Sequence, residues 1–273
     1  MSLLTINSAT CKQCGICVQA CPALIIAMGA EDNLPFVSAE KEALCILCGH
    51  CEAVCPDGAL THNLLTAAET ILPETAEVNR TNLSAYFRNR RSIRAYRSKP
   101  VDKQLLEQVM DVVRYAPTAS NRQLNKWVIV QDKATVTKIT EETVNWMQSV
   151  VDTNPEVAKR MKIIGLIAAY KKGTDRISRN APHLVIGYGD ANYSWGIQDS
   201  MIAATHLELL LPSFGLGGCW GGYLMGAFQQ SPALKKLIGL DDSSVVHSVL
   251  MVGYPKYRYY KIPPRKESQV NWL

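Results

Sequence analysis

Two runs of cysteines constrain this 273-residue chain more than any other feature of its sequence. The first run extends from Cys11 to Pro22 and the second from Cys45 to Pro56, and both have the spacing C-x2-C-x2-C-x3-C-P. Together they contain eight of the nine cysteines. Steps of two residues let three thiolates on one tight loop converge on one face of a cluster, and the fourth cysteine of such a run ligates the other cluster of a pair. The spacing therefore predicts two [4Fe–4S] clusters with crossed ligand sets.

Each predicted ligand set combines three cysteines of one run with the last cysteine of the other. One cluster takes Cys11, Cys14, Cys17 and Cys55, and the other takes Cys45, Cys48, Cys51 and Cys21. Crossed ligation also ties together two halves of a segment that is too small to bury much core.

Zinc and disulfides are the alternatives to clusters. Zinc sites are usually built from two separated cysteine pairs rather than from three cysteines within seven residues. A disulfide framework suits a small secreted chain, whereas the first residues, Met1 to Thr5, show no signal peptide. We therefore expect reduced cysteines, iron–sulfur clusters and a cytoplasmic location.

Composition restricts the partners of the chain. It is 47% hydrophobic and 19% charged, as in globular proteins, and no run of 18 apolar residues predicts a membrane span. The net charge of +5 combines −4 in residues 1–66, where two lysines face six acids, with +9 in the remainder. Because the bases are dispersed and no nucleic-acid-binding motif accompanies them, an anionic cofactor explains the basic part better than nucleic acid does.

Periodicity divides the chain into a cysteine-rich domain at 1–66, a polar linker at 67–82 and a larger domain at 83–273. The first domain repeats its cysteine run, each copy followed by a short apolar segment, with a turn and short strand at 33–37 between them. In the larger domain, apolar periodicity predicts helices at residues 83–90, 103–115, 135–151, 155–172, 198–211 and 231–238. Strands are predicted at residues 127–130, 183–188 and 245–252.

Four segments of the larger domain are candidates for a second cofactor site. Arg88–Arg94 gathers guanidinium groups beside a hydroxyl, which suits a phosphate. Ala116–Gln123 offers small polar groups to a sugar-like chain or a heteroaromatic edge, and Gly215–Tyr223 lets the backbone approach a flat ligand. Gly253–Pro255 leaves a strand, and Arg265 follows at a distance that lets it complete a phosphate clamp. Taken singly, these segments also fit a solvated basic face, a turn, a helix stop and an ordinary tail charge.

In this order and spacing, the four segments resemble the nitroreductase family of FMN-dependent oxidoreductases over about residues 83–270, and residues 1–65 resemble a bacterial-type two-cluster ferredoxin. The resemblance implies an α+β sandwich with a mixed, mostly antiparallel sheet flanked by helices, and a homodimer with FMN in the interface. It also implies a set of FMN-binding residues: Arg90, Arg91, Ser92 and Arg265 at the phosphate, Arg94 at the isoalloxazine edge, and Gly221 and Gly222 at the flavin face. The set is completed by residues that come from the partner copy: Pro117, Thr118, Ala119, Asn121 and Gln123. Thr118 and Ala119 stand where family members often have serines, and the family's basic or amide residue near flavin N1 has only residues 171–176 as a candidate segment.

The implied function is an oxidoreductase that passes electrons from two [4Fe–4S] clusters to FMN and on to a small organic acceptor such as a nitroaromatic or a quinone, with ferredoxin or NAD(P)H as the donor. Two alternatives stay open. In one, NAD(P)H or a substrate reduces FMN and the clusters export electrons, and in the other the protein is a non-enzymatic electron carrier or redox sensor. No residue is assigned as a catalytic proton donor, because the five histidines are scattered and lack a partner motif.

Overall fold

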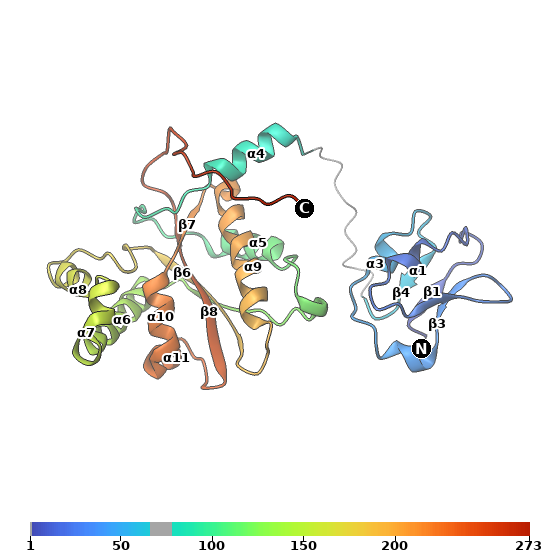
Figure 1. Cartoon of the computed structure of the whole chain (residues 1–273), viewed down its shortest axis with the longest axis horizontal. Helices are drawn as coiled ribbons and strands as arrows, with labels where there is room; N and C mark the ends of the chain where they lie inside the picture. The colour runs from blue at the N-terminus through green and yellow to red at the C-terminus, as the bar shows by residue number, and fades with distance from the viewer. Residues whose placement is uncertain (1, 66–77) are drawn as a thin grey trace. The chain divides into compact units, whose positions relative to one another are not determined.

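The computed structural model describes residues 2–65 and 78–273. The chain divides into two compact units, which are treated separately below (Figure 1). One comprises Met1–Glu77 with Ser120–Arg122, and the other comprises Val78–Ala119 with Gln123–Leu273. Most of the linker predicted at 67–82 lies outside the described residues.

The first unit contains two small antiparallel sheets and three short helices. Its sheets pair β1 (Leu4–Ile6) with β4 (Leu60–His62) and β2 (Ile26–Met28) with β3 (Pro35–Val37). Its helices are α1 (Ile16–Ala20), α2 (Ala39–Glu42) and α3 (His50–Ala53). The interior consists of aliphatic side chains together with two cysteines: Leu3, Leu4, Cys21, Ile25, Ile26, Val37, Cys51 and Leu60.

The two cysteine runs have the same local conformation. Helices α1 and α3 each start directly after the second cysteine and a glycine. These glycines, Gly15 and Gly49, have φ values of 70° and 69°, a left-handed conformation that is costly for residues with a Cβ. The internal repeat in the sequence is therefore a repeat in the backbone.

The second unit is an α+β sandwich. Its four-stranded sheet is antiparallel throughout the described residues and has the order β5-β6-β8-β7. The strands are β5 (Lys126–Val130), β6 (His183–Asp190), β7 (Gly217–Trp220) and β8 (Ser244–Gly253). The helices are α4 (Arg80–Asn89), α5 (Lys103–Val113), α6 (Lys133–Thr153), α7 (Pro155–Arg160), α8 (Ile163–Lys171), α9 (Gly196–Leu210), α10 (Gly222–Gln230) and α11 (Pro232–Leu237), with short 3-10 turns η2 (Ala119–Asn121) and η3 (Leu211–Phe214).

Alternate residues of the central strands face two hydrophobic layers. On β6, Leu184 and Ile186 join the layer formed with α6, α8 and α10, whereas Val185 joins the layer formed with α5 and α9. Figure 1 shows α10 and α6 on one side of the sheet and α9 and α5 on the other. Because successive side chains of a strand point to opposite faces, both faces of β6 and β8 are buried, which explains their continuous apolar sequences.

Two of the predicted helices had wrong bounds. Helix α4 starts at Arg80 instead of residue 83, because the Asn79 side chain caps it by accepting from the N–H groups of Thr81 and Asn82. The helix predicted at 155–172 is two helices, since the backbone turns left-handed at Lys162 (φ 58°).

No helix in the described part of the chain is long and apolar enough to cross a membrane.

The glycine-rich segment is more ordered than its sequence predicts. Gly217 and Gly218 belong to β7, and a Cβ at either position would lie 2.3 Å from Ile93 or 2.7 Å from Leu211. The glycines therefore let neighbouring side chains pack against the strand. Helix α10, which follows directly, was also not predicted.

Candidate functional site

The eight cysteines of the two runs line two cavities in the first unit. One cavity is lined by Cys11, Cys14, Cys17 and Cys55, and the other by Cys21, Cys45, Cys48 and Cys51. These are the two crossed sets that the spacing predicts. Apolar residues fill much of the remaining lining, among them Ile6 and Leu60 in the first cavity and Leu3 and Ile25 in the second.

Backbone N–H groups point at several of the cysteine sulfurs. The N–H of Gln13 donates to Cys11 Sγ at 3.5 Å, and the N–H of Leu47 donates to Cys45 Sγ at 3.4 Å. Gln13 and Leu47 occupy equivalent places in the two runs and both have left-handed backbones (φ 56° and 53°). Such N–H groups stabilise negative charge on sulfur and set the potential of a bound cluster.

Burial makes two of these cysteines, Cys51 and Cys17, poor at ionising without a metal. It raises the pKa of the Cys51 thiol to about 11 and raises the pKa of Cys17 as well. Cluster iron supplies the positive charge that deprotonation of such buried thiols requires. Within residues 2–65 and 78–273, no three Cys, His, Asp or Glu side chains gather around a single-ion site. Four thiols around an apolar cavity fit a cubane, whose four irons each take a separate thiolate.

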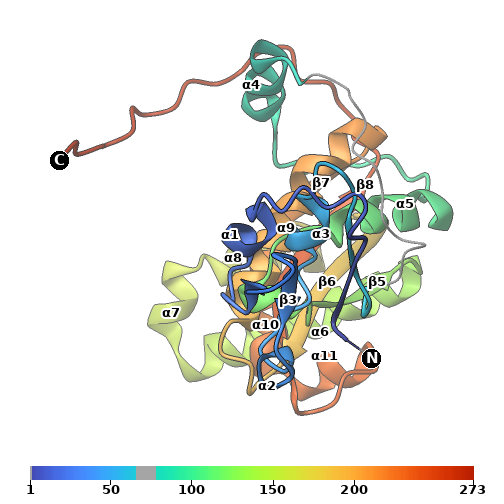
Figure 2. The same ribbon diagram turned by 90° about the vertical axis from the view of Figure 1, so that its right-hand side faces the viewer.

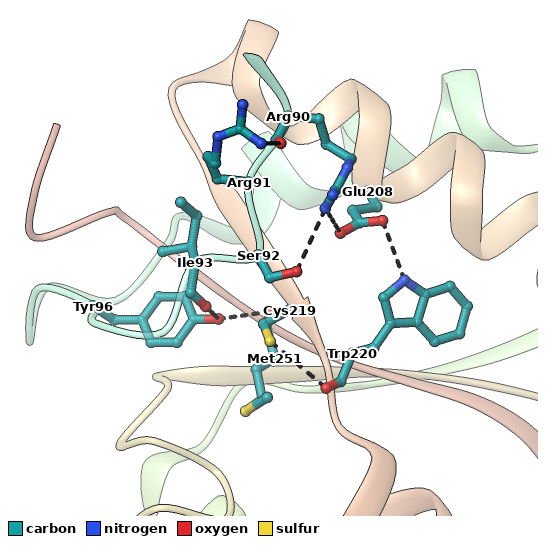
Figure 3. A network of polar contacts seen from close by, with 9 residues as sticks. All are labelled: Arg90, Arg91, Ser92, Ile93, Tyr96, Glu208, Cys219, Trp220 and Met251. Atoms are coloured by element: carbon teal, nitrogen blue, oxygen red, sulfur yellow. Dashed lines mark hydrogen bonds and ion pairs between the residues drawn. The ribbon is translucent and has the colours of Figure 1, made fainter. Parts of the chain in front are cut away.

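In the second unit, the basic segment after α4 is held by a buried acid (Figure 3). Arg90 Nη1 lies 2.8 Å from Glu208 Oε1 and 3.5 Å from the hydroxyl oxygen of Ser92. The other carboxylate oxygen of Glu208 accepts a hydrogen bond of 3.2 Å from the Trp220 indole N–H. Glu208 was not predicted as a site residue, although an acid between Leu207 and Leu209 was a signal for a buried partner. The Arg91 guanidinium instead donates to the carbonyls of Arg88 and Arg90 at the end of α4.

A cavity of about 280 Å³ opens beside this segment. Three of the predicted FMN residues, Arg94, Gly221 and Gly222, line it. The remaining lining residues are not among the predicted FMN-binding residues: Met161, Arg176, Ile177, Arg179, Cys219, Trp220, Tyr223 and Met251. Arg176 is the last residue of the segment named as a candidate for the basic group near the flavin.

The glycines at the cavity leave space for a ligand. Gly221 precedes α10 and Gly222 is the first residue of that helix, and a Cβ on Gly222 would meet no protein atom within 4 Å. The first N–H groups of a helix have no intrahelical acceptor and carry partial positive charge. With the Arg94 guanidinium on the same cavity, this wall suits a flat, electron-rich ligand such as a flavin ring.

The Tyr96 side chain fixes the irregular segment that carries Arg94, and Cys219 packs nearby in the cavity wall. The Tyr96 hydroxyl is close to the carbonyl oxygens of Ile93 (2.7 Å) and Met251 (3.1 Å), and burial raises the pKa of Tyr96 well above its usual value. Cys219 is buried, and burial likewise raises its pKa against the opposing influence of Arg94 and Arg179. Cys219 is therefore a neutral thiol that packs in the wall.

The other predicted FMN residues do not meet at this cavity. The Thr118 hydroxyl accepts from the N–H of Gln123 at 3.0 Å, and the N–H of Ala119 donates to Asp199 at 2.9 Å. These contacts shape the turn, and Asn121 within it has a left-handed backbone (φ 53°). Pro117, Thr118, Ala119 and Gln123 do not line the cavity. Nor does Arg265, which is exposed in the C-terminal segment that leaves the sheet after β8 (Figure 2).

Each of the two units resembles a known family of proteins. A model of the nitroreductase family matches residues 87–254, and a model of a 4Fe-4S dicluster domain matches residues 10–60. A Thermus thermophilus protein named NADH dehydrogenase is 27% identical over 182 residues, which span 63% of this chain and 85% of that protein. Among solved structures, FMN-bound nitroreductases of Bacteroides fragilis and Desulfitobacterium hafniense are each 18% identical, with TM-scores of 0.58 and 0.57. Both matches cover 72% of this chain and the whole of the compared chain, so they share its fold.

Proposed function

Because the chain belongs to the nitroreductase family and carries a 4Fe-4S dicluster domain, we propose that it is an FMN-dependent reductase fed with electrons through two [4Fe–4S] clusters. Electrons enter singly at the clusters and leave in pairs for a small organic acceptor such as a nitroaromatic or a quinone. When bound, FMN supplies the conversion between one-electron and two-electron chemistry. The proposal rests on the arrangement of the cysteines around two cavities, in a chain whose larger unit has a cavity that suits a flavin ring.

The residues of the chain bind and orient the cofactor. Arg90, Arg91 and Ser92 are assigned to the phosphate, with Glu208 holding the Arg90 guanidinium beside the Ser92 hydroxyl. The Arg94 side chain and the N–H groups at the start of α10 meet the ring at its electron-rich edge. The remaining assigned residues complete the site, with Arg265 at the phosphate and with five residues from the partner copy of a homodimer: Pro117, Thr118, Ala119, Asn121 and Gln123.

The homodimer has support in the exposed surface of the second unit. On α4, directly before the basic segment, Leu83 and Phe87 are 44% and 53% exposed. Exposed apolar side chains on one helix are typical of a surface that is covered in an assembly. Light scattering of the purified protein tests this, with a dimer expected and a monomer containing stoichiometric FMN as the contrary result.

A reducing compartment such as the cytoplasm suits free cluster thiols.

A second direction of electron flow has one specific observation in its favour, the relative named NADH dehydrogenase. In that version NAD(P)H reduces the flavin and the clusters export electrons. The non-enzymatic carrier is not retained, because the family consists of oxidoreductases.

Anaerobic stopped-flow separates the two directions. The protein is mixed with reduced ferredoxin, NADH or NADPH while flavin and cluster absorbance are followed. The proposal expects reduced ferredoxin to bleach the clusters first and the flavin second. Rapid flavin bleaching by NAD(P)H alone, followed by the clusters, assigns the reverse direction.

Analysis of cofactors per chain tests the foundation of both versions. Each cubane holds about four irons, so about eight irons and about one FMN per chain are expected in oxygen-protected protein. Four or fewer irons, or zinc in their place, contradict the double cluster.

A further inference from the structure

Two arginines at the second unit's cavity are not among the residues assigned to FMN in the proposed function. Arg176 and Arg179 line the cavity together with Arg94, and no Asp or Glu is among the residues that the structure describes as lining it. Arg94 is assigned to the flavin edge. Three guanidinium groups without a carboxylate leave an excess of positive charge that an anion of the ligand or substrate balances.

The one acid beside these arginines in the sequence is used to build their loop. The Asp175 carboxylate accepts hydrogen bonds from the N–H groups of Ile177 (2.8 Å), Ser178 (2.9 Å) and Asn180 (2.8 Å). It also accepts from the Ser178 hydroxyl at 2.5 Å. A carboxylate with four donors of its own is occupied as a scaffold for the loop.

The loop presents Arg179 in an unfavourable backbone conformation. Arg179 and Asn180 have φ values of 55° and 52°, a region that residues with a Cβ adopt rarely. The Ser178 side chain is buried and also accepts a hydrogen bond of 2.9 Å from the Thr140 hydroxyl of α6, which anchors the loop to the core. Backbone conformations of this kind are concentrated at ligand sites, where the surrounding structure holds them.

The flavin phosphate does not account for these arginines. Its assigned residues, Arg90 and Ser92, are held at Glu208 and do not line the cavity. The rest of the cavity lining is largely apolar and aromatic. It includes Tyr223, whose hydroxyl donates a hydrogen bond of 3.0 Å to the carbonyl of Met161. An anion next to a flat apolar surface matches a molecule that stacks near the flavin and carries a charged substituent.

We propose that Arg176 and Arg179 bind an oxyanion of the molecule that exchanges electrons with the flavin, so that the enzyme selects a flat substrate with a carboxylate or phosphate substituent. The inference rests on the proposed function, since it places the flavin at Arg94 and Gly222. The two sources of such an oxyanion are an aromatic carboxylate acceptor and the phosphates of NAD(P)H. The arginines bind and position the substrate and take no part in electron transfer.

Binding is measured by calorimetry on the anaerobic protein with its flavin and clusters. The probes are 4-nitrobenzoate, its neutral analogue 4-nitrobenzamide, and NADP⁺. The variants are Arg176→Gln and Arg179→Asn, because asparagine tolerates the left-handed backbone of position 179. Arg114→Gln, at an exposed residue directly after α5, is the matched control.

Each variant is expected to weaken 4-nitrobenzoate binding about 10-fold or more, as for loss of a charge-assisted hydrogen bond, and to change 4-nitrobenzamide binding less than about 2-fold. This selective loss supports the proposal with an acceptor carboxylate as the source. A selective loss for NADP⁺ alone supports it with a dinucleotide phosphate as the source. Equal effects on all three probes, no effect, or loss of FMN from the variants overturns it, and loss of FMN reassigns the arginines to the cofactor.

Turnover separates this inference from the proposed function. Reduction of 4-nitrobenzoate to the nitroso compound consumes two electrons, which the flavin supplies, and two protons from solvent, and it releases water while the carboxylate is unchanged. Arginine-dependent binding without turnover leaves the inference standing and contradicts the reductase. Turnover of both acceptors with equal KM in wild type and variants supports the reductase and overturns the inference.

Discussion

The guanidinium of Arg90 lies 2.8 Å from the carboxylate of Glu208, and only 9% of the Glu208 side chain is exposed. The same carboxylate accepts from the Trp220 indole. The acid therefore fixes the direction of Arg90 while neutralising part of its charge. We therefore expect this contact to influence how tightly the proposed phosphate site binds FMN.

Glu208→Gln is expected to tighten FMN binding about 5-fold. The amide oxygen can still accept a hydrogen bond from Arg90 or from Trp220 but not from both. The neutral side chain no longer competes for the positive charge of Arg90, a gain of about 1 kcal/mol for a partly exposed pair. Quenching of FMN fluorescence on titration with flavin-free protein measures the dissociation constant. Ser92→Ala is the opposing control and weakens binding. A weaker complex for Glu208→Gln shows that orientation of Arg90 by the acid outweighs its charge.

In the proposed crossed ligation, Cys55 is a ligand of the cluster whose other ligands lie in the first run. Cys55→Ser is therefore expected to lower iron from about eight to about four per chain and to spare the cluster held by Cys45 and Cys48. Iron analysis and electron paramagnetic resonance of the reduced protein check this. Cys219→Ser, which changes the one cysteine outside the runs, leaves iron unchanged. A variant of Cys55 that retains all its iron contradicts the crossed sets.

Much of the framework is predictable because its signals are local. The spacing of Cys11, Cys14 and Cys17 restricts a short loop, and the apolar strands at 183–188 and 245–252 are buried wherever the sheet is placed. Asp102 and Ser231 cap the helices that follow them, and each accepts from an N–H of that helix. In all these cases the determining contacts lie within a few residues.

The unpredicted parts depend on contacts between distant residues. Gly217 and Gly218 have low strand propensity, and they form β7 because β8 offers its edge and Ile93 fills the space beside them. Arg179 reaches the cavity only through the loop that Asp175 holds. The pairing of Glu208 with Arg90 spans 118 residues, so no window of sequence contains it.

A buried histidine predicts the pH dependence of stability. His247 on β8 is 6% exposed, neither ring nitrogen has a hydrogen-bond partner within the described residues, and burial lowers its pKa. The unfolded chain then takes up a proton below about pH 6.5 while the folded chain does not, so stability falls as pH falls below that value. His183 has the same direction of shift and adds to the effect.

His247→Leu is expected to reduce the loss of stability between pH 7.5 and 5.5 and to leave the contribution of His183. Chemical denaturation at the two pH values, under anaerobic conditions, measures it. His206→Gln, on the exposed side of α9, keeps the full pH dependence. If His247→Leu leaves the change of stability with pH unaltered, the His247 ring is protonated equally in the folded and unfolded states.

The last prediction separates binding from stability at the start of α10. Gly222→Ala is expected to leave stability unchanged or raise it by up to about 1 kcal/mol, because a Cβ there meets no protein atom and alanine favours the helix. The same methyl group projects into the space assigned to the flavin, so FMN affinity falls by about 10-fold or more, a loss of about 1.4 kcal/mol or greater. Gly165→Ala is the matched control, since Gly165 lies in helix α8 and its Cβ also meets no atom within 4 Å. Denaturation measures the stability of each variant, and FMN titration measures its affinity for the flavin. If the two alanines stabilise alike and only Gly222→Ala loses FMN, the flavin lies against the start of α10, whereas equal FMN affinity in both variants removes it from that wall.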